Sequence, residues 1–273
     1  MTVPALYRGL FDDAALFPPG DLPLPEAVPA HEAHRSAWYA EAVGPFLCGA
    51  GRLAELRATT TAPLRVALVL PGGSSQLAPA LADADGLTVV GVELADPDLR
   101  AAVATLNEQL PPGVAAAVEL PRGEGLEASL DVLAGTPYRA KFRTGGLAAG
   151  AFPSEAELAA FLAGCAGRGL PYKCTAGLHH AVRHTDPATG FEHHGFLNVL
   201  LAAQAGDDAG LAAEVLAERS GEVLAKAALD LTDTRIDDVR RRFTAFGTCS
   251  VAEPLADLAA LGLLAPPAPL EDR

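Results

Sequence analysis

The chain repeats one pattern along most of its length: a short apolar run, then a longer segment with helical spacing. An opening strand near 6–14 and seven further apolar runs make eight predicted strands. Strands that are apolar throughout are typical of parallel sheets covered by helices on both faces. Eight strand–helix units in 273 residues predict a closed (β/α)8 barrel, with 1–273 as a single domain. The seven further runs lie at 45–50, 64–73, 87–94, 114–120, 138–146, 170–177 and 243–250.

An open doubly wound sheet is the main alternative fold. It is disfavoured because no G-x-G-x-x-G motif follows the first predicted strand. One unit is longer than the others: the crossover at 178–242, which begins with the polar segment "HHAVRHTDPATGFEHHG" and continues as a long helical insertion between the seventh and eighth predicted strands. A long loop at the carboxyl end of a barrel strand often serves as a lid or binding element, so we expect one or the other here. Residues 265–273 are expected to form a flexible tail.

Composition restricts the partners and the compartment. The formal net charge of −14 argues against nucleic-acid binding, which needs a basic surface. No apolar stretch reaches the roughly 18 residues of a membrane span. The first residues lack the features of a signal peptide, and the four cysteines form no CxxC pair. We therefore expect a cytoplasmic protein with a small-molecule substrate, no cofactor, and no nucleic-acid or membrane partner. Homo-oligomer formation stays open.

Cationic residues alternate along the sixth predicted strand, "YRAKFRTGG" at 138–146. Arg139, Lys141 and Arg143 share one face, because successive side chains of a strand point to opposite faces. Lys173 and Thr175 have the same spacing on the next strand. Barrel active sites lie at the carboxyl ends of the strands, so we expect these side chains to face such a site. Further candidates near predicted strand ends are Asp12, Glu93, Glu119, Thr144, His179, His180, Gly247, Thr248 and Ser250.

Two lysines on adjacent strands suggest a specific chemistry. Repulsion between ammonium groups and burial both lower the pKa of a lysine below about 10.4. Only the neutral amine attacks a carbonyl carbon, so a lysine with a lowered pKa can form a Schiff base. The structural alternative is that each lysine reaches solvent or pairs with an acidic residue.

The two lysine motifs resemble those of the deoxyribose-phosphate aldolases, which are class I aldolases. "KFRTGG" at 141–146 and "KCTAG" at 173–177 match the strand-six and strand-seven lysine motifs of that family, and "RRRFTAFGTCS" at 240–250 is similar to its last strand. The resemblance covers the last third of the chain. It implies that Lys141 is the Schiff-base lysine and that Lys173 lowers its pKa, with Gly247, Thr248 and Ser250 beside a phosphate or other polar group.

The phosphate loop of that family is replaced here by "GLHHAVR" at 177–183, so a phosphorylated and a non-phosphorylated substrate both stay open. The chain also resembles uncharacterised bacterial β/α-barrel proteins, which implies the fold and no activity.

Five histidines within 16 positions support a rival interpretation. They could bind a metal ion in a hydrolase or isomerase, although barrel metallohydrolases carry His-x-His on the first strand, where this chain has "FDDA". A histidine-rich lid that binds substrate or transfers protons, and plain surface histidines, are the other interpretations. The five are His179, His180, His184, His193 and His194.

Three functional hypotheses follow. The first is a Schiff-base aldolase or lyase acting on a small, anionic carbonyl compound, with Arg143 orienting the anionic group. In it Lys141 is the nucleophile, Lys173 adjusts its pKa, and Glu93, Glu119 or His179 carries protons. The second is the metal-dependent enzyme, and the third a non-catalytic barrel that binds an anionic ligand. Cys249 precedes a predicted helix and is either a reactive thiol or, more commonly at such sites, a buried structural one.

Overall fold

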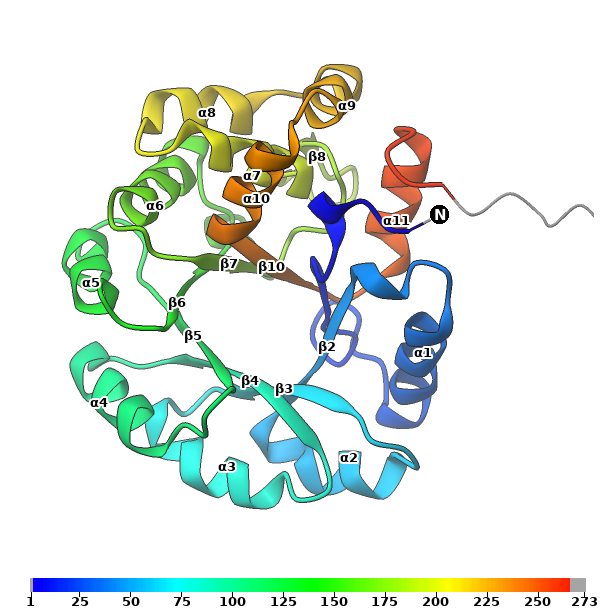
Figure 1. Cartoon of the computed structure of the whole chain (residues 1–273), viewed down its shortest axis with the longest axis vertical. Helices are drawn as coiled ribbons and strands as arrows, with labels where there is room; N and C mark the ends of the chain where they lie inside the picture. The colour runs from blue at the N-terminus through cyan, green and yellow to red at the C-terminus, as the bar shows by residue number, and fades with distance from the viewer. Residues whose placement is uncertain (1, 266–273) are drawn as a thin grey trace, which may run out of the picture.

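The computed structural model describes residues 2–265 and contains a closed barrel of eight parallel strands (Figure 1). Around the barrel the strands follow the order β1-β10-β7-β6-β5-β4-β3-β2. The predicted (β/α)8 barrel is therefore confirmed. The strands are β1 (Phe11–Asp13), β2 (Val43–Gly49), β3 (Arg65–Leu70), β4 (Thr88–Ala95), β5 (Ala115–Glu119), β6 (Arg139–Arg143), β7 (Tyr172–Thr175) and β10 (Phe243–Thr248).

Helices cover the outside of the barrel, as Figure 1 shows. Aromatic side chains fill the space between strands and helices: Phe142 of β6 stacks on Phe161 at 4.4 Å between ring centroids. Because Phe142 points outward, its neighbours Lys141 and Arg143 point into the barrel. The helices between consecutive barrel strands are α1 (Leu24–Ser36), α2 (Leu53–Thr59), α3 (Leu77–Asp83), α4 (Leu99–Gln109), α5 (Leu126–Leu133) and α6 (Glu155–Gly167), with α11 (Ala252–Ala260) after β10.

The crossover from β7 to β10 holds the long helical insertion that the sequence predicts. It opens with a two-stranded antiparallel hairpin, and α8 of its helical part packs against α6. Phe196 at its centre packs edge-on against Phe11 and is stacked on Phe246, which secures the insertion to the barrel wall. Its elements are β8 (His184–Thr185), β9 (Glu192–His193), α7 (Phe196–Ala202), α8 (Ala209–Ala217), α9 (Gly221–Leu229) and α10 (Asp233–Arg242).

The amino end of the barrel interior is not filled by large side chains. Residues such as Gly91, Ala115 and Ala245 line a cavity of about 960 Å³ there. Barrels usually fill this space with layers of branched side chains, so the small residues leave room beneath the strand centres. Of the expected flexible tail at 265–273, residues 266–273 lie outside the described residues. Within residues 2–265 no helix is long and apolar enough to cross a membrane.

Candidate active site at the carboxyl mouth of the barrel

A cavity of about 1080 Å³ lies at the carboxyl ends of the strands. Glu93, Lys141 and Arg143 line it from the strands, and the loops after β1, β6, β7 and β10 form its walls. Arg139 lines the cavity at the amino end instead. The three cations of β6 therefore occupy the barrel interior at successive heights, with Lys141 between the two arginines.

A cluster of paired charges lies between the two cavities. The Lys141 Nζ is 2.9 Å from Glu93 Oε2 and 3.2 Å from Glu119 Oε2. The Lys173 Nζ is 2.5 Å from Asp12 Oδ2 and also donates to Glu93 Oε1. Glu93 thus bridges the two lysines, one oxygen to each. All of these residues except Glu119 are buried, and Glu119 is partly exposed.

The strand register explains how residues far apart in the sequence meet. Lys141 is level with Lys173 in the β6–β7 pairing and with Glu119 in the β5–β6 pairing. Residues that are level in adjacent parallel strands point to the same side of the sheet. Glu93 comes from β4, the next strand around the barrel. Its side chain therefore joins the same interior face.

Opposite charges favour the ionised form of Glu93, Glu119 and Lys173, whereas burial outweighs Lys173 at Asp12 and raises the pKa of that carboxyl. Burial by itself would raise the pKa of Glu93, but Lys141 and Lys173 outweigh it and lower that pKa to about 2. Burial likewise opposes the charge of Lys173, yet the carboxylates of Asp12 and Glu93 raise its pKa above the ordinary value. Burial would raise the pKa of Glu119, which Lys141 and Arg143 instead hold below its usual range. The resting site is a network of salt bridges rather than a pair of bare ammonium groups.

The two adjacent aspartates of β1 lie in different surroundings. Asp12 was expected to bind substrate at the mouth, but its carboxylate bonds to Lys173 and lines the cavity at the amino end. Asp13 lines the mouth cavity instead, and its Oδ2 is 2.9 Å from His31 Nδ1. Both residues of this pair are buried. Side chains alternate along β1, so Asp12 points into the barrel toward Lys173 and Asp13 points to the other side, toward His31.

The hydroxyl-bearing candidates divide into two groups. Thr144 and Thr248 are buried, and their hydroxyls donate to main-chain carbonyls: Thr144 to Thr175 at 3.2 Å and Thr248 to Ser250 at 2.9 Å. These two threonines therefore hold the strand ends in place. Thr175, Gly247 and Ser250 line the mouth cavity. The Ser250 Oγ also accepts from the Glu253 N–H at 3.3 Å.

Four of the five histidines line the cavity, whereas His194 is buried away from it. His179 Nδ1 lies 2.7 Å from Glu253 Oε2, and His180 Nδ1 lies 3.1 Å from Asp257 Oδ2. His194 is fully buried and bonds through Nε2 to the carbonyl of Pro153. Across residues 2–265, no three or more His, Cys, Asp or Glu side chains are grouped so as to hold a metal ion. His184 and His193 face one another across the hairpin, with ring centroids 5.2 Å apart.

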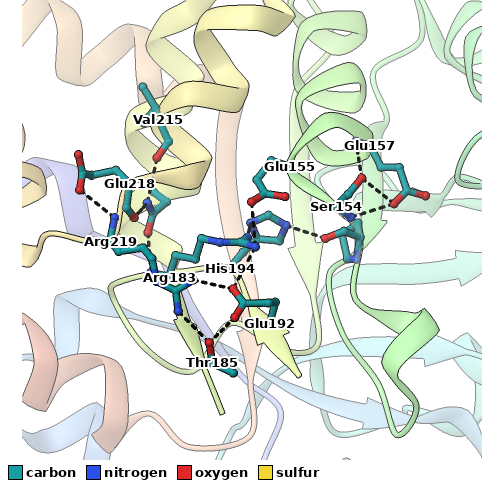
Figure 2. A network of polar contacts seen from close by, with 12 residues as sticks. Ser154, Glu155, Glu157, Arg183, Thr185, Glu192, His194, Val215, Glu218 and Arg219 are labelled. Atoms are coloured by element: carbon teal, nitrogen blue, oxygen red, sulfur yellow. Dashed lines mark hydrogen bonds and ion pairs between the residues drawn. The ribbon is translucent and has the colours of Figure 1, made fainter. Parts of the chain in front are cut away.

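Sequence reasoning missed the ion-pair network that holds the hairpin (Figure 2). The Arg183 guanidinium is 8% exposed and contacts Glu155 at 2.9 Å and Glu192 at 3.1 Å. Arg219 reaches the same Glu192 carboxylate at 2.8 Å. The network joins β9 to the start of α6, which puts Phe191 and His193 in the cavity wall. In the sequence, Arg183 is one arginine within a run of histidines, and this pattern does not indicate which carboxylates it contacts.

Comparison of the chain with family models, with curated proteins and with solved structures finds no match. These comparisons neither add to nor oppose the resemblance to deoxyribose-phosphate aldolases. The function is accordingly inferred from the mouth cavity and its charged residues.

Proposed function

We propose that the protein is a Schiff-base enzyme, an aldolase or lyase of the class I type, acting on a small carbonyl compound with an anionic group. One observation carries the proposal. The Lys141 amino group is buried in the strand wall of the mouth cavity, with two carboxylates within 3.2 Å of it. A lysine in this position has proton acceptors within hydrogen-bond distance and borders a cavity that can hold a substrate. Amine catalysis requires both.

The chain contains three lysines, and their environments separate them clearly. Lys226 lies on α9 with its side chain 75% exposed. Lys173 lines the cavity at the amino end, beneath Glu93. Lys141 is the one of the three that lines the mouth cavity. These environments support Lys141 as the nucleophile.

The proposed step balances without an added reactant. Glu119 takes one proton from the Lys141 ammonium, and the neutral amine adds to the carbonyl carbon to form a C–N bond. A second N–H proton moves to the former carbonyl oxygen, and Glu119 returns the first proton as the C–O bond breaks. Water leaves and an iminium ion stays on Lys141, with no change of oxidation state.

Glu119 suits the proton transfer better than Glu93. Two lysines share Glu93 and lower its pKa to about 2, which makes it a weak base. Glu119 is less deeply buried and is shared by Lys141 and Arg143. The Arg143 side chain is 49% exposed at the mouth, where it can orient a substrate carboxylate.

A second candidate function is binding of an anionic ligand without chemistry. The salt bridges favour it, because each carboxylate beside Lys141 stabilises the charged ammonium form, which is not nucleophilic. A substrate would have to displace or reorganise these bonds before Lys141 could react. A histidine-based metallohydrolase has no comparable support, since His179 and His180 at the cavity bond to separate carboxylates and the buried His194 bonds to a main-chain carbonyl.

Borohydride trapping separates the two candidates. The protein is incubated with small aldehydes and 2-oxo acids and reduced with borohydride. The mass of the intact protein is then measured by mass spectrometry. Wild type is expected to retain one reduced adduct per chain, and Lys141→Ala to retain none. Lys226→Ala is the matched control and is expected to behave as wild type, because Lys226 is exposed and far from the barrel interior. If none of the carbonyl compounds gives an adduct, the Schiff-base proposal fails and binding of an anionic ligand without chemistry is the function that stays.

A further inference from the structure

A second group of chemically active side chains lies in the wall of the mouth cavity, apart from the two lysines. Cys249 follows the end of β10, His179 follows β7, and Glu253 belongs to the first turn of α11. All three line the cavity. We propose that they form a nucleophilic thiol site, with Cys249 as the nucleophile, His179 as its base and Glu253 orienting the imidazole.

The contacts give each residue a distinct role. Glu253 Oε2 is 2.7 Å from His179 Nδ1, so the carboxylate accepts a hydrogen bond from the N–H of that nitrogen. The Cys249 Sγ lies 3.6 Å from Nε2 and 3.7 Å from Nδ1, and with Nδ1 bonded to Glu253 the Nε2 atom is the one free to accept. A nucleophile, a base within reach of it and a third group that orients the base are the arrangement of nucleophilic catalysis.

The resting thiol needs this base. Burial, together with the nearby charge of Glu253, raises the pKa of Cys249 to about 11, so the thiol is protonated at neutral pH. Reaction therefore requires removal of the proton as the new bond forms. His179 is positioned to accept it, which makes the reactivity of Cys249 depend on a neighbour rather than on its own ionisation.

Access distinguishes Cys249 from the other cysteines. Cys48, Cys165 and Cys174 are completely buried, whereas Cys249 is partly exposed and lines a cavity. The carboxylates of Glu253 and Asp21 lie near enough to disfavour the thiolate. The same charges repel anionic reagents, so the site is suited to neutral acyl or alkyl electrophiles.

With a neutral activated ester the reaction is an acyl transfer. The Sγ–C bond forms as the ester C–O bond breaks, the alkoxide or phenolate departs, and the thiol proton passes to His179. A thioester on Cys249 results, and no oxidation or reduction takes place. Water can later cleave the thioester and restore the thiol.

The test uses p-nitrophenyl acetate on the full-length protein near neutral pH. Release of p-nitrophenolate is followed by absorbance, and the acetyl group is located by peptide mapping. Wild type is expected to carry the acetyl group on Cys249, and His179→Ala to acquire it at least about tenfold more slowly. Glu253→Gln is expected to fall between them, because the imidazole is retained but less well oriented.

Two controls make the result decisive. Asp257→Asn changes another carboxylate of α11, one that contacts His180, and should acetylate Cys249 at the wild-type rate. Circular dichroism establishes that each variant is folded. Acetylation of Cys249 in His179→Ala at the wild-type rate would overturn the proposal. So would a folded wild type that acquires acetyl groups elsewhere and none on Cys249. Both readouts are independent of Schiff-base formation at Lys141.

Discussion

Glu93 is the residue on which the other buried charges depend. It is 3% exposed and accepts from Lys141 through one oxygen and from Lys173 through the other. A buried ion costs several kcal/mol to desolvate, and attraction offsets this cost only when the hydrogen-bond geometry is good. The removal of one member therefore leaves its partners buried and uncompensated.

Lys173→Met removes an ammonium group while keeping most of the volume of the side chain. Asp12 and Glu93 would lose a shared partner, so we expect the free energy of unfolding to fall by about 3–5 kcal/mol. Urea denaturation at pH 7 measures the change. Lys226→Met, at an exposed position, should shift the same quantity by less than about 0.5 kcal/mol. Equal, small losses in the two variants would show that the buried bridges contribute little.

The pKa of Glu93 predicts how stability changes in acid. Its value is about 2 in the folded protein, against 4.5 for the unperturbed group. The unfolded chain therefore binds the proton first, and the stabilisation present above pH 4.5 is lost as the pH falls toward 2. The unfolding free energy of wild type should decline more steeply across this range than that of Glu93→Gln. Glu108→Gln, at an exposed position, should follow wild type; parallel curves for wild type and Glu93→Gln would contradict the assignment.

Alternation along the strands was enough to predict at the residue scale that Lys141 and Arg143 lie on one face. It could not choose their partners, because partner choice depends on the height of each strand in a tilted barrel. Asp12 shows the consequence. Its side chain points into the barrel, as expected. However, it bonds to Lys173 and lines the cavity at the amino end instead of the mouth cavity.

The β8–β9 hairpin is the element that shapes the cavity wall. Its two short strands cannot form a stable hairpin alone, since isolated hairpins are marginal in water. Arg183 stabilises the hairpin because its ion pairs join Glu192 of β9 to Glu155 of α6. Phe152 adds an aromatic contact, with its ring centroid 4.3 Å from that of His193.

Arg183→Met is expected to loosen the hairpin and leave the barrel folded. The half-buried carboxylates of Glu155 and Glu192 would then turn toward water, so the global loss should be only about 1–3 kcal/mol. Hydrogen–deuterium exchange should quicken over 184–193 and stay unchanged in β5 and β6. Arg219→Met is the matched control, because it removes an exposed arginine from the same glutamate and should have a smaller effect. Unchanged exchange in Arg183→Met would show that other contacts hold the hairpin.

The elements themselves were largely predictable. Each of the seven apolar runs overlaps a strand, because a strand covered on both faces must be apolar throughout. Some strands are shorter than expected: β7 spans four residues within 170–177, and the opening strand expected at 6–14 is Phe11–Asp13. The hairpin was missed because its strands span two residues each and carry histidine, threonine and glutamate. Its pairing depends on side chains from α6 and from the segment before α9, which no local pattern reveals.

At the scale of the whole molecule, the barrel encloses charged residues between two cavities. Small residues together with charged ones such as Arg139 and Lys173 line its amino end, and an enlarged crossover and the loops after β1, β6 and β10 line its carboxyl end. The repeat of eight units predicted this architecture from composition and spacing. The fold alone does not select a reaction, since barrels of this kind support many chemistries. The proposed function rests on where Lys141 lies.

The most direct test of that claim is the site at which a carbonyl compound becomes attached. Wild type is reduced with borohydride in the presence of one 2-oxo acid, digested and mapped by mass spectrometry. We predict a reduced adduct on the peptide that contains Lys141 and none on those that contain Lys173 or Lys226. An adduct confined to Lys226, or unmodified peptides throughout, would contradict the proposal that this barrel is a Schiff-base enzyme.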